Sequence, residues 1–145
     1  AFVEIDENST PTGALVPVAG TPFDFREAKP IGRDIESEHP QLRLGGGYDH
    51  NFILSGPLAA QAYSDVSGIQ LQCFTDLPGM QLYTANSLGE FTGKGGKKMG
   101  PHQAFCLETQ LFPDALNHYG FPSPILHAGE KLFHETVYKL SLNEV

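Results

Sequence analysis

The sequence predicts an all-β protein whose strands form an antiparallel β-sandwich or barrel. Glycine and proline are frequent, at 16 and 11 of 145 residues, and no window shows a sustained helical pattern of apolar residues. Short strand-like runs instead alternate with turns rich in Gly, Pro and Asp, a spacing typical of an antiparallel meander. Within one of these runs, Ile69, Leu71 and Cys73 alternate with glutamines, as expected for a half-buried strand.

The expected elements follow in order along the chain. A short strand at 1–5 precedes an irregular loop at 7–20 and a polar segment at 27–44 that winds over the surface. Three glycines at 45–47 then interrupt regular structure, since glycine allows backbone conformations that other residues avoid. The predicted strands of the meander are 51–54, 59–64, 69–75 and 80–84, and strands at 105–110 and 131–142 follow a basic, solvated loop at 92–101. No internal boundary is evident, so residues 1–145 are treated as a portion of one domain.

The composition limits the classes of partner. The net charge is −8, from 17 acidic and 9 basic residues, and this argues against a nucleic-acid or anionic-membrane surface, which needs a positive field. No apolar run approaches the roughly 20 residues of a membrane span. The N-terminal segment lacks the positive charge and the long apolar core of a secretory signal. We therefore expect no nucleic acid, no membrane and a cytoplasmic location.

The sequence offers no recognisable set of metal ligands. Cys73 and Cys106 lie in separate strand-like runs, with no CxxC pair and no clustered spacing. Two buried, reduced thiols are the expected state of such cysteines outside a secretory context. We therefore predict no metal site and no disulfide.

One carboxylate stands out in the strand-like run Phe105–Gln110. Glu108 lies between Leu107 and Thr109, and an unpaired carboxylate buried in such a run is costly to ionise. Its side chain could reach solvent or a partner, or its proton affinity could be tuned for acid–base chemistry. On these residues alone, the first interpretation is favoured.

Three motifs, taken together, reverse that preference. They read Gly-Tyr-Asp-His-Asn-Phe at 47–52, Pro-Gly-Met-Gln-Leu-Tyr-Thr at 78–84 and Phe-Cys-Leu-Glu-Thr-Gln at 105–110, the last followed by Phe-Pro-Asp at 112–114. In this order and spacing they resemble the C-terminal half of the aldose 1-epimerase (galactose mutarotase) family. Segments within 11–25 and 121–138 resemble the same family, so the resemblance covers essentially the whole chain.

The resemblance implies the C-terminal part of a large antiparallel β-sandwich, the galactose mutarotase-like supersandwich, with a sugar-binding cleft on one face. The family interconverts the α and β anomers of free aldohexoses such as galactose and glucose, without a metal or an organic cofactor. A base takes the proton of the C1 hydroxyl while an acid protonates the ring oxygen, so that the ring opens and closes again. By motif, Glu108 takes the position of the general base, and Asp49 and Gln81 take those of residues that contact the sugar.

Alternative roles stay open for these residues. Asp49 follows a glycine-rich turn and could cap it, and Gln81 could be an ordinary polar residue of a strand. The family's acid is a histidine in an Asn-His-x-x-Phe-Asn-Leu motif, which this sequence lacks, and neither His50 nor His102 matches it. The alternative to an epimerase is therefore a non-catalytic carbohydrate-binding or interaction module with the same fold.

Half of a sandwich would expose sheet edges and an apolar face, and both are liabilities for a free chain. We therefore expect these 145 residues to be a portion of a longer protein. The missing N-terminal half or self-association would then cover the exposed surface. A structural β-fragment without a ligand is the third interpretation.

Overall fold

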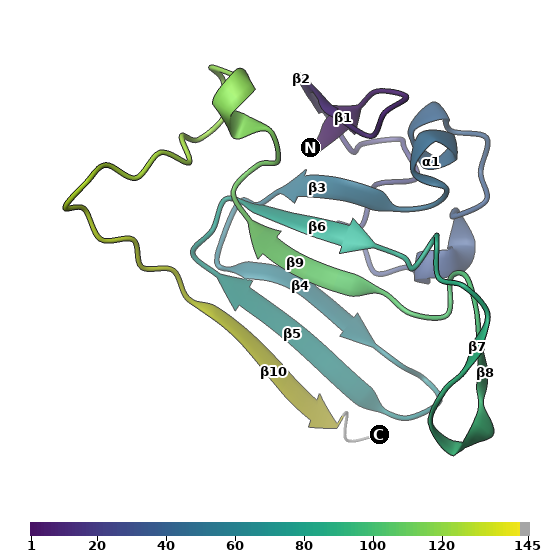
Figure 1. The fold of residues 1–145 in the computed structure, drawn as a ribbon. Coiled ribbons are helices and arrows are strands. Elements are labelled where there is room, and N and C mark those ends of the chain that lie inside the picture. The colour runs from purple at the N-terminus through teal and green to yellow at the C-terminus, as the bar shows by residue number, and fades with distance from the viewer. Residues whose placement is uncertain (143–145) are drawn as a thin grey trace.

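The computed structural model describes residues 1–142 and consists mainly of antiparallel strands (Figure 1). The strands are β1 (Phe2–Ile5), β2 (Pro11–Val16), β3 (Asp49–Ile53), β4 (Leu58–Tyr63), β5 (Ile69–Thr75), β6 (Gly79–Tyr83), β7 (Phe91–Thr92), β8 (Lys98–Met99), β9 (Cys106–Gln110) and β10 (Thr136–Leu142). The helical elements are α1 (Pro40–Gly45) and the 3-10 turns Ile31–Arg33, Lys94–Gly96 and Ala115–Asn117. The predicted all-β, antiparallel class is confirmed.

Within residues 1–142 the strands form three antiparallel sheets. The largest has the order β2-β1-β3-β6-β9, the second has the order β10-β5-β4, and β7 pairs with β8 alone. In Figure 1, β3, β6 and β9 lie side by side in the middle of the molecule, whereas a long extended connection leads away from the sheets and returns as β10. β9, the strand that carries Glu108, is an edge strand of the largest sheet.

The register of β3, β6 and β9 decides which side chains share a face. Asn51 lies opposite Gln81, and Gln81 lies opposite Glu108. Alternate residues of a strand point to the same side. The face therefore also carries Asp49, two residues before Asn51, and Gln110, two residues after Glu108.

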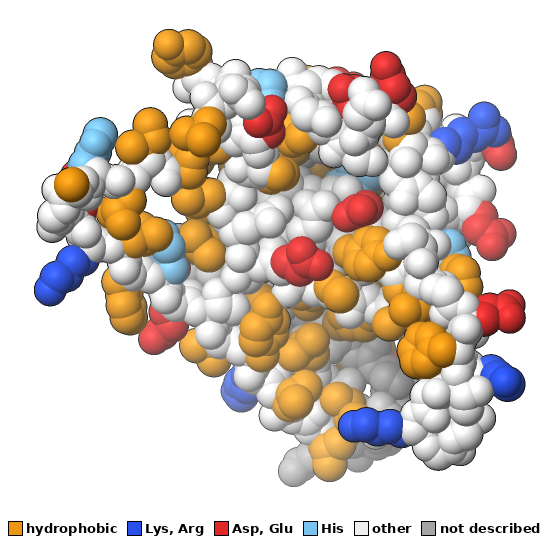
Figure 2. All heavy atoms as spheres, viewed as in Figure 1, with side chains coloured by type: hydrophobic (Ala, Val, Ile, Leu, Met, Phe, Trp, Pro, Cys, Tyr) orange, Lys and Arg blue, Asp and Glu red, His pale blue; other side chains and the backbone are white. Residues whose placement is uncertain are grey.

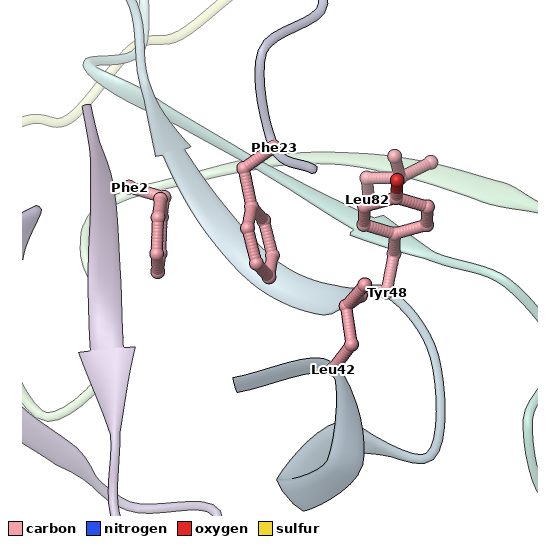
Figure 3. Packing of buried hydrophobic residues seen from close by; sticks show 5 residues of the cluster. All are labelled: Phe2, Phe23, Leu42, Tyr48 and Leu82. Carbon is pink, nitrogen blue, oxygen red and sulfur yellow. The ribbon is translucent and has the colours of Figure 1, made fainter. Parts of the chain in front are cut away.

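The opposite face of this sheet packs on the main hydrophobic core. Figure 3 shows Phe2 and Phe23 stacked on one another, with ring centroids 4.1 Å apart, near Leu42, Tyr48 and Leu82. Leu42 belongs to α1, and Phe23 belongs to the connection between β2 and β3. That connection therefore covers one face of the sheet, whereas on the polar face a second cluster that includes Phe112 and Phe121 covers Val3 and Ile53 and leaves the part around Gln81 and Glu108 open.

The prediction that residues 27–44 only wind over the surface is incomplete, because α1 forms at their end. The His39 side chain caps α1 by accepting the backbone N–H of Gln41 at 3.3 Å, and a proline occupies the first helical position. Gly46 ends the helix in the left-handed conformation, at φ +65°. These capping signals are visible in the sequence, but six residues are too few to show an apolar periodicity.

Several other boundaries differ from the prediction. The loop expected at 7–20 contains β2, and the last strand begins at Thr136 instead of 131. β2 is an edge strand that starts at Pro11 and contains Gly13 at φ +90°. Both residue types count against a strand in a sequence pattern, although an edge tolerates them. The loop at 92–101 includes the short β7–β8 pair.

Two side-chain contacts tie β9 to β10 of the second sheet. The Tyr138 hydroxyl donates to the Leu107 carbonyl at 2.7 Å, and the hydroxyl oxygens of Thr109 and Thr136 are 2.6 Å apart. Burial raises the pKa of Tyr138, so its hydroxyl remains a donor at neutral pH. Because Leu107 and Thr109 flank Glu108, the backbone that carries this carboxylate is held on both sides.

Cys73 and Cys106 are both free thiols, and only Cys73 is buried. Cys106 is exposed, which corrects the expectation of two buried thiols; its side chain lies on the open polar face, opposite Tyr83. Residues 1–142 contain no helix long and apolar enough to cross a membrane. Over the same range, no group of three His, Cys, Asp or Glu side chains is placed to hold a metal ion.

Candidate active site

Three adjacent strands bring the predicted site residues onto one open face. Glu108, Gln81 and Asn51 form a row across β9, β6 and β3. Residues directly opposite in antiparallel strands have Cβ atoms about 4.5–5.5 Å apart, so Glu108 and Gln81 are neighbours. Asp49 joins them, because Gln81 Nε2 donates to Asp49 Oδ1 at 2.7 Å. Figure 2 shows acidic side chains in the middle of the molecule, where Figure 1 draws β6 and β9.

Glu108 is exposed on the edge strand β9. The carboxylate is therefore not desolvated in this chain. Of the two interpretations of the sequence, the one in which the Glu108 side chain reaches solvent describes its position. The same exposure leaves the carboxylate accessible to a ligand on the face of Gln81. A carboxylate in hydrogen-bond reach of a bound hydroxyl can accept its proton.

The turn before Asp49 is fixed by a partly buried polar network. Asn86 Nδ2 donates to the Tyr48 carbonyl at 3.0 Å, and Thr84 Oγ1 donates to Asn86 Oδ1 at 2.6 Å. Gly47 adopts φ +137°, and a Cβ at this position would overlap the Asn86 side chain. Glycine is therefore required here by both conformation and space. The network sets the direction in which the chain enters β3 and hence the position of Asp49.

His50 follows Asp49 in the sequence but lies on the opposite face, fully buried among aromatic rings. Its Nε2 is 3.2 Å from Gln41 Oε1, and its Nδ1 accepts the backbone N–H of Asp49 at 3.1 Å. Because an amide oxygen only accepts, these partners assign the ring proton to Nε2. Burial, with a smaller effect of His39, lowers the pKa of His50 to about 4. His50 thus supports the strand of Asp49 from behind and does not face the open side.

Sequence reasoning missed three residues of this face. Gln110 Nε2 donates to Gln81 Oε1 at 3.2 Å and to Asn51 Oδ1 at 3.1 Å. Gly79 lies between Gln110 and Ile53 in the register, and a Cβ there would lie 2.5 Å from Asn51 Oδ1. The signal that could have found two of them is spacing: Asn51 and Gln110 each lie two residues from a predicted site residue, on the same side of the strand.

A pocket opens on the same face. Asp49, Asn51 and Gln81 line it from the sheet, and Ser9 and Pro113 contribute to its wall from the connections that follow β1 and β9. A carboxylate and side-chain amides offer acceptors and donors to a ligand rich in hydroxyl groups. The pocket also has apolar walls at Val3 and Ile5, and Glu108 lies on the neighbouring strand without lining it. The arrangement therefore offers hydrogen-bond partners to hydroxyl groups beside Glu108.

The fold and this face define an antiparallel β protein with a polar, carboxylate-bearing binding surface. The family model described as aldose 1-epimerase matches residues 1–139. The chain belongs to the aldose 1-epimerase family.

Individual relatives agree with this assignment. The chain is 40% identical to a galactose mutarotase of Rattus norvegicus over 147 residues, which is 98% of this chain, and 34% identical to an aldose 1-epimerase of Escherichia coli over 145 residues, which is 95% of it. A solved structure of galactose 1-epimerase from Lactobacillus acidophilus superimposes with a TM-score of 0.80 at 31% identity, and the match covers 97% of this chain and 41% of that one. The chain spans about 42% of the length of the two curated relatives.

Proposed function

We propose that this chain is the base-bearing part of an aldose 1-epimerase, which interconverts the α and β anomers of free aldohexoses such as galactose and glucose. The observation that carries the proposal is the placement of Glu108, Gln81 and Asp49 on one accessible face. Membership of the family supports the activity, since relatives of this chain are named galactose mutarotase and aldose 1-epimerase.

In this proposal, Asp49 and Gln81 hold hydroxyl groups of the sugar while Glu108 acts on C1. Glu108 takes the proton of the C1 hydroxyl, the C1–O5 bond breaks, and O5 receives a proton from an acid on the other side of the ring. Rotation about C1–C2 and reclosure give the other anomer. Each positioned proton transfer typically contributes about 10² to 10⁴ in rate. The steps are proton transfers only, so the proposal includes no metal and no organic cofactor.

The acid of this reaction is proposed to come from the remainder of the protein. The motifs of this sequence identify no acid, and His50 is buried on the face opposite to Asp49. Acid and base must stand on different sides of C1 and O5, each within hydrogen-bond reach. A second part of the protein that closes over the open face would meet this requirement.

A non-catalytic carbohydrate-binding or interaction module is the second candidate. The observation that favours it is the pocket on this face, which Asp49 and Gln81 line and Glu108 does not. In such a module, Asp49 and Gln81 contact the sugar and Glu108 is a further polar contact. The two candidates differ in whether the rate of anomer exchange changes.

Polarimetry of freshly dissolved α-D-galactose separates the two candidates. In the protein that includes the acid-bearing remainder, an epimerase brings the sugar to anomeric equilibrium faster than buffer does, and Glu108→Gln should lower that rate by about 10² or more. Glu36→Gln removes another exposed carboxylate, in the connection that covers the opposite face, and should leave the rate unchanged. Equal acceleration above the buffer rate by the wild type and by Glu108→Gln would exclude Glu108 as the base.

If the protein with its acid-bearing remainder folds but gives no acceleration, a galactose titration followed by NMR tests the binding module. Binding that becomes roughly tenfold weaker in Asp49→Ala, the effect of about one lost charged hydrogen bond, would identify the binding module. Asp65→Ala, in an exposed turn between β4 and β5, is the matched control. Equal affinity of both variants would mean that Asp49 only shapes its turn, and no binding at all would favour a structural fragment.

A further inference from the structure

Four polar side chains of the open face form one continuous chain of hydrogen bonds. It runs from Asp49 to Gln81 at 2.7 Å, from Gln81 to Gln110 at 3.2 Å, and from Gln110 to Asn51 at 3.1 Å. Asp49 and Gln81 are the proposed sugar contacts. Gln110 and Asn51 have no part in the proposed reaction, so their place in this hydrogen-bond network needs a separate explanation.

The hydrogen-bond chain has only one consistent direction. An ionised carboxylate accepts and cannot donate, so Asp49 requires the Nε2 end of the Gln81 amide. The Oε1 end of Gln81 then faces Gln110 and requires a donor, which Gln110 supplies with its own Nε2. The second hydrogen of Gln110 Nε2 goes to Asn51 Oδ1. Reversing any one amide would bring two donors or two acceptors together.

The direction of these hydrogen bonds leaves one donor of Asn51, the last residue of the network, without a partner in the described part of the chain. Asn51 is buried, at 1% exposure, and its Nδ2 is without a hydrogen-bond partner among residues 1–142. A buried donor without a partner is unfavourable, because it has lost its contact with water and gained no acceptor in exchange. Turning the Asn51 amide would move that donor but would place it against Gln110 Nε2, which is also a donor. The unpaired Asn51 Nδ2 is therefore a consequence of the hydrogen-bond direction that the Asp49 carboxylate requires. Asn51 and Asp49 both line the pocket on this face.

We propose that Gln110 is a positioning residue that, together with Asp49, holds the Gln81 amide in one orientation through its Nε2 donor. The hydrogen bond between Gln81 and Asp49 uses one N–H of the amide and one carboxylate oxygen. The second N–H of Gln81 and the second oxygen of Asp49 are then available to a ligand. The pair therefore presents one donor and one acceptor side by side, which matches two neighbouring hydroxyls of a pyranose. This last step rests on the proposed function, whereas the orientation of Gln81 does not.

The orientation can be tested in the sugar-free chain by NMR of the side-chain amides. The Gln81 Nε2 resonances of the wild type should report the hydrogen bond to Asp49 and should shift in Asp49→Asn. Gln110→Glu keeps the size of the side chain but replaces the donor by an acceptor. In this variant the Gln81 amide has a carboxylate on each side and cannot donate to both in its present position, so we expect its resonances to shift and to depend on position 110 as well as on Asp49. Gln72→Glu, which faces Gln61 in the second sheet, adds the same charge as a control and should leave Gln81 unchanged.

A double variant distinguishes a directional role from space filling. Asp49→Asn with Gln110→Glu keeps the net charge and allows the whole hydrogen-bond chain to run in reverse, from an amide at position 49 through Gln81 to a carboxylate at position 110. Asn51 can then turn its Nδ2 toward that carboxylate, which removes the orphan donor. The double variant should recover the urea stability lost in Gln110→Glu, and its Gln81 resonances should follow the introduced carboxylate alone.

The outcomes separate this inference from the proposed function. Gln81 resonances that do not shift in Asp49→Asn, or that are unchanged in Gln110→Glu, would overturn the positioning role. A galactose titration forms the second arm, in which Gln110→Glu should weaken binding roughly tenfold and Gln72→Glu should not. A chain that binds no galactose but shows the expected amide behaviour would refute sugar binding by this chain and leave the role of Gln110 standing.

Discussion

His50 illustrates how one buried side chain can serve a neighbouring site without facing it. Its two ring nitrogens are both used, Nε2 toward Gln41 and Nδ1 toward the backbone N–H of Asp49. Protonation of Nδ1 would remove the acceptor and place a charge among aromatic rings. The position of Asp49 is therefore linked to the neutral state of a residue on the other side of the sheet.

This link predicts a loss of stability in mild acid. The pKa of His50 falls from 6.5 in the unfolded chain to about 4 in the folded one, so the unfolded chain binds more protons between these values. The contribution of neutral His50 to the free energy of unfolding is fully present above about pH 6.5. It decreases as the pH falls toward 4, by about 3 kcal/mol in total. Urea unfolding at several pH values should show this loss in the wild type.

His50→Gln, which does not titrate, should show a smaller decrease over the same pH range, and His127→Gln, which replaces an exposed histidine, should behave as the wild type does. Parallel pH profiles for the wild type and His50→Gln would contradict the assignment.

At the residue scale, the sequence leads to Glu108, Asp49 and Gln81 because their motifs are contiguous strings. Asn51 and Gln110 belong to the same strings but carry no recognisable chemistry by themselves. Their part follows only from the register of three strands, which joins residues 59 positions apart in a single hydrogen bond. A pattern along one strand cannot supply that pairing.

At the scale of the element, β6 is the strand on which the polar face depends. It is paired on both sides, by β3 and by β9, and its first residue is Gly79. The lack of a side chain at Gly79 leaves the space that the Asn51 amide occupies, and the Phe112 ring is also within 3.0 Å of a Cβ built there. The glycine thus joins the polar network to the second core cluster.

Gly79→Ala should therefore destabilise the chain and displace the Asn51 amide. The added methyl group would overlap both neighbours, and overpacking of this kind typically costs about 1–3 kcal/mol. Gly56→Ala, in the turn between β3 and β4 where a Cβ meets no neighbouring atom, is the matched control and should cost far less. Urea unfolding measures both, and a Gly79→Ala variant as stable as Gly56→Ala would show that the site has room to adjust.

The strands of the meander are predictable because apolar and polar residues alternate over a length typical of a strand, as at Ile69, Leu71 and Cys73. The edge strand β2 and the helix α1 are not found in this way. β2 contains a proline and a left-handed glycine, which an edge tolerates but a pattern rejects. α1 has clear caps but only six residues, so packing of Leu42 on the core stabilises it more than helical propensity does.

At the scale of the whole molecule, the second sheet leaves apolar side chains uncovered. Leu140 pairs with Leu71, and Leu142 pairs with Ile69, so these residues share one face. Leu140 and Leu142 are 70% and 71% exposed. Figure 2 shows hydrophobic side chains gathered in the lower part of the view, where Figure 1 draws β5 and β10. A contiguous apolar patch of this kind favours association.

We therefore expect the isolated chain to self-associate through this face. Sedimentation equilibrium should show an apparent mass that rises with protein concentration, and Leu140→Lys should shift the distribution toward the 15.8 kDa monomer. Leu126→Lys, at a half-exposed position in the extended connection before β10, should leave it unchanged. A wild-type chain that stays monomeric at all concentrations, or an equal response of the two variants, would contradict association through this face.

The contact between Tyr138 and Leu107 has a consequence for the order in which the protein can assemble during synthesis. β4 and β5 are neighbours in the sequence and can pair as soon as both have left the ribosome. β10 pairs with β5 across 61 residues at Thr136 and Thr75, and its tyrosine reaches β9 only in that position. Contacts between distant segments form late because they must first close a long loop. The strand that bears Glu108 therefore gains its lateral support among the last of all elements, and a nascent chain interrupted before residue 138 would carry the carboxylate on an unbraced edge.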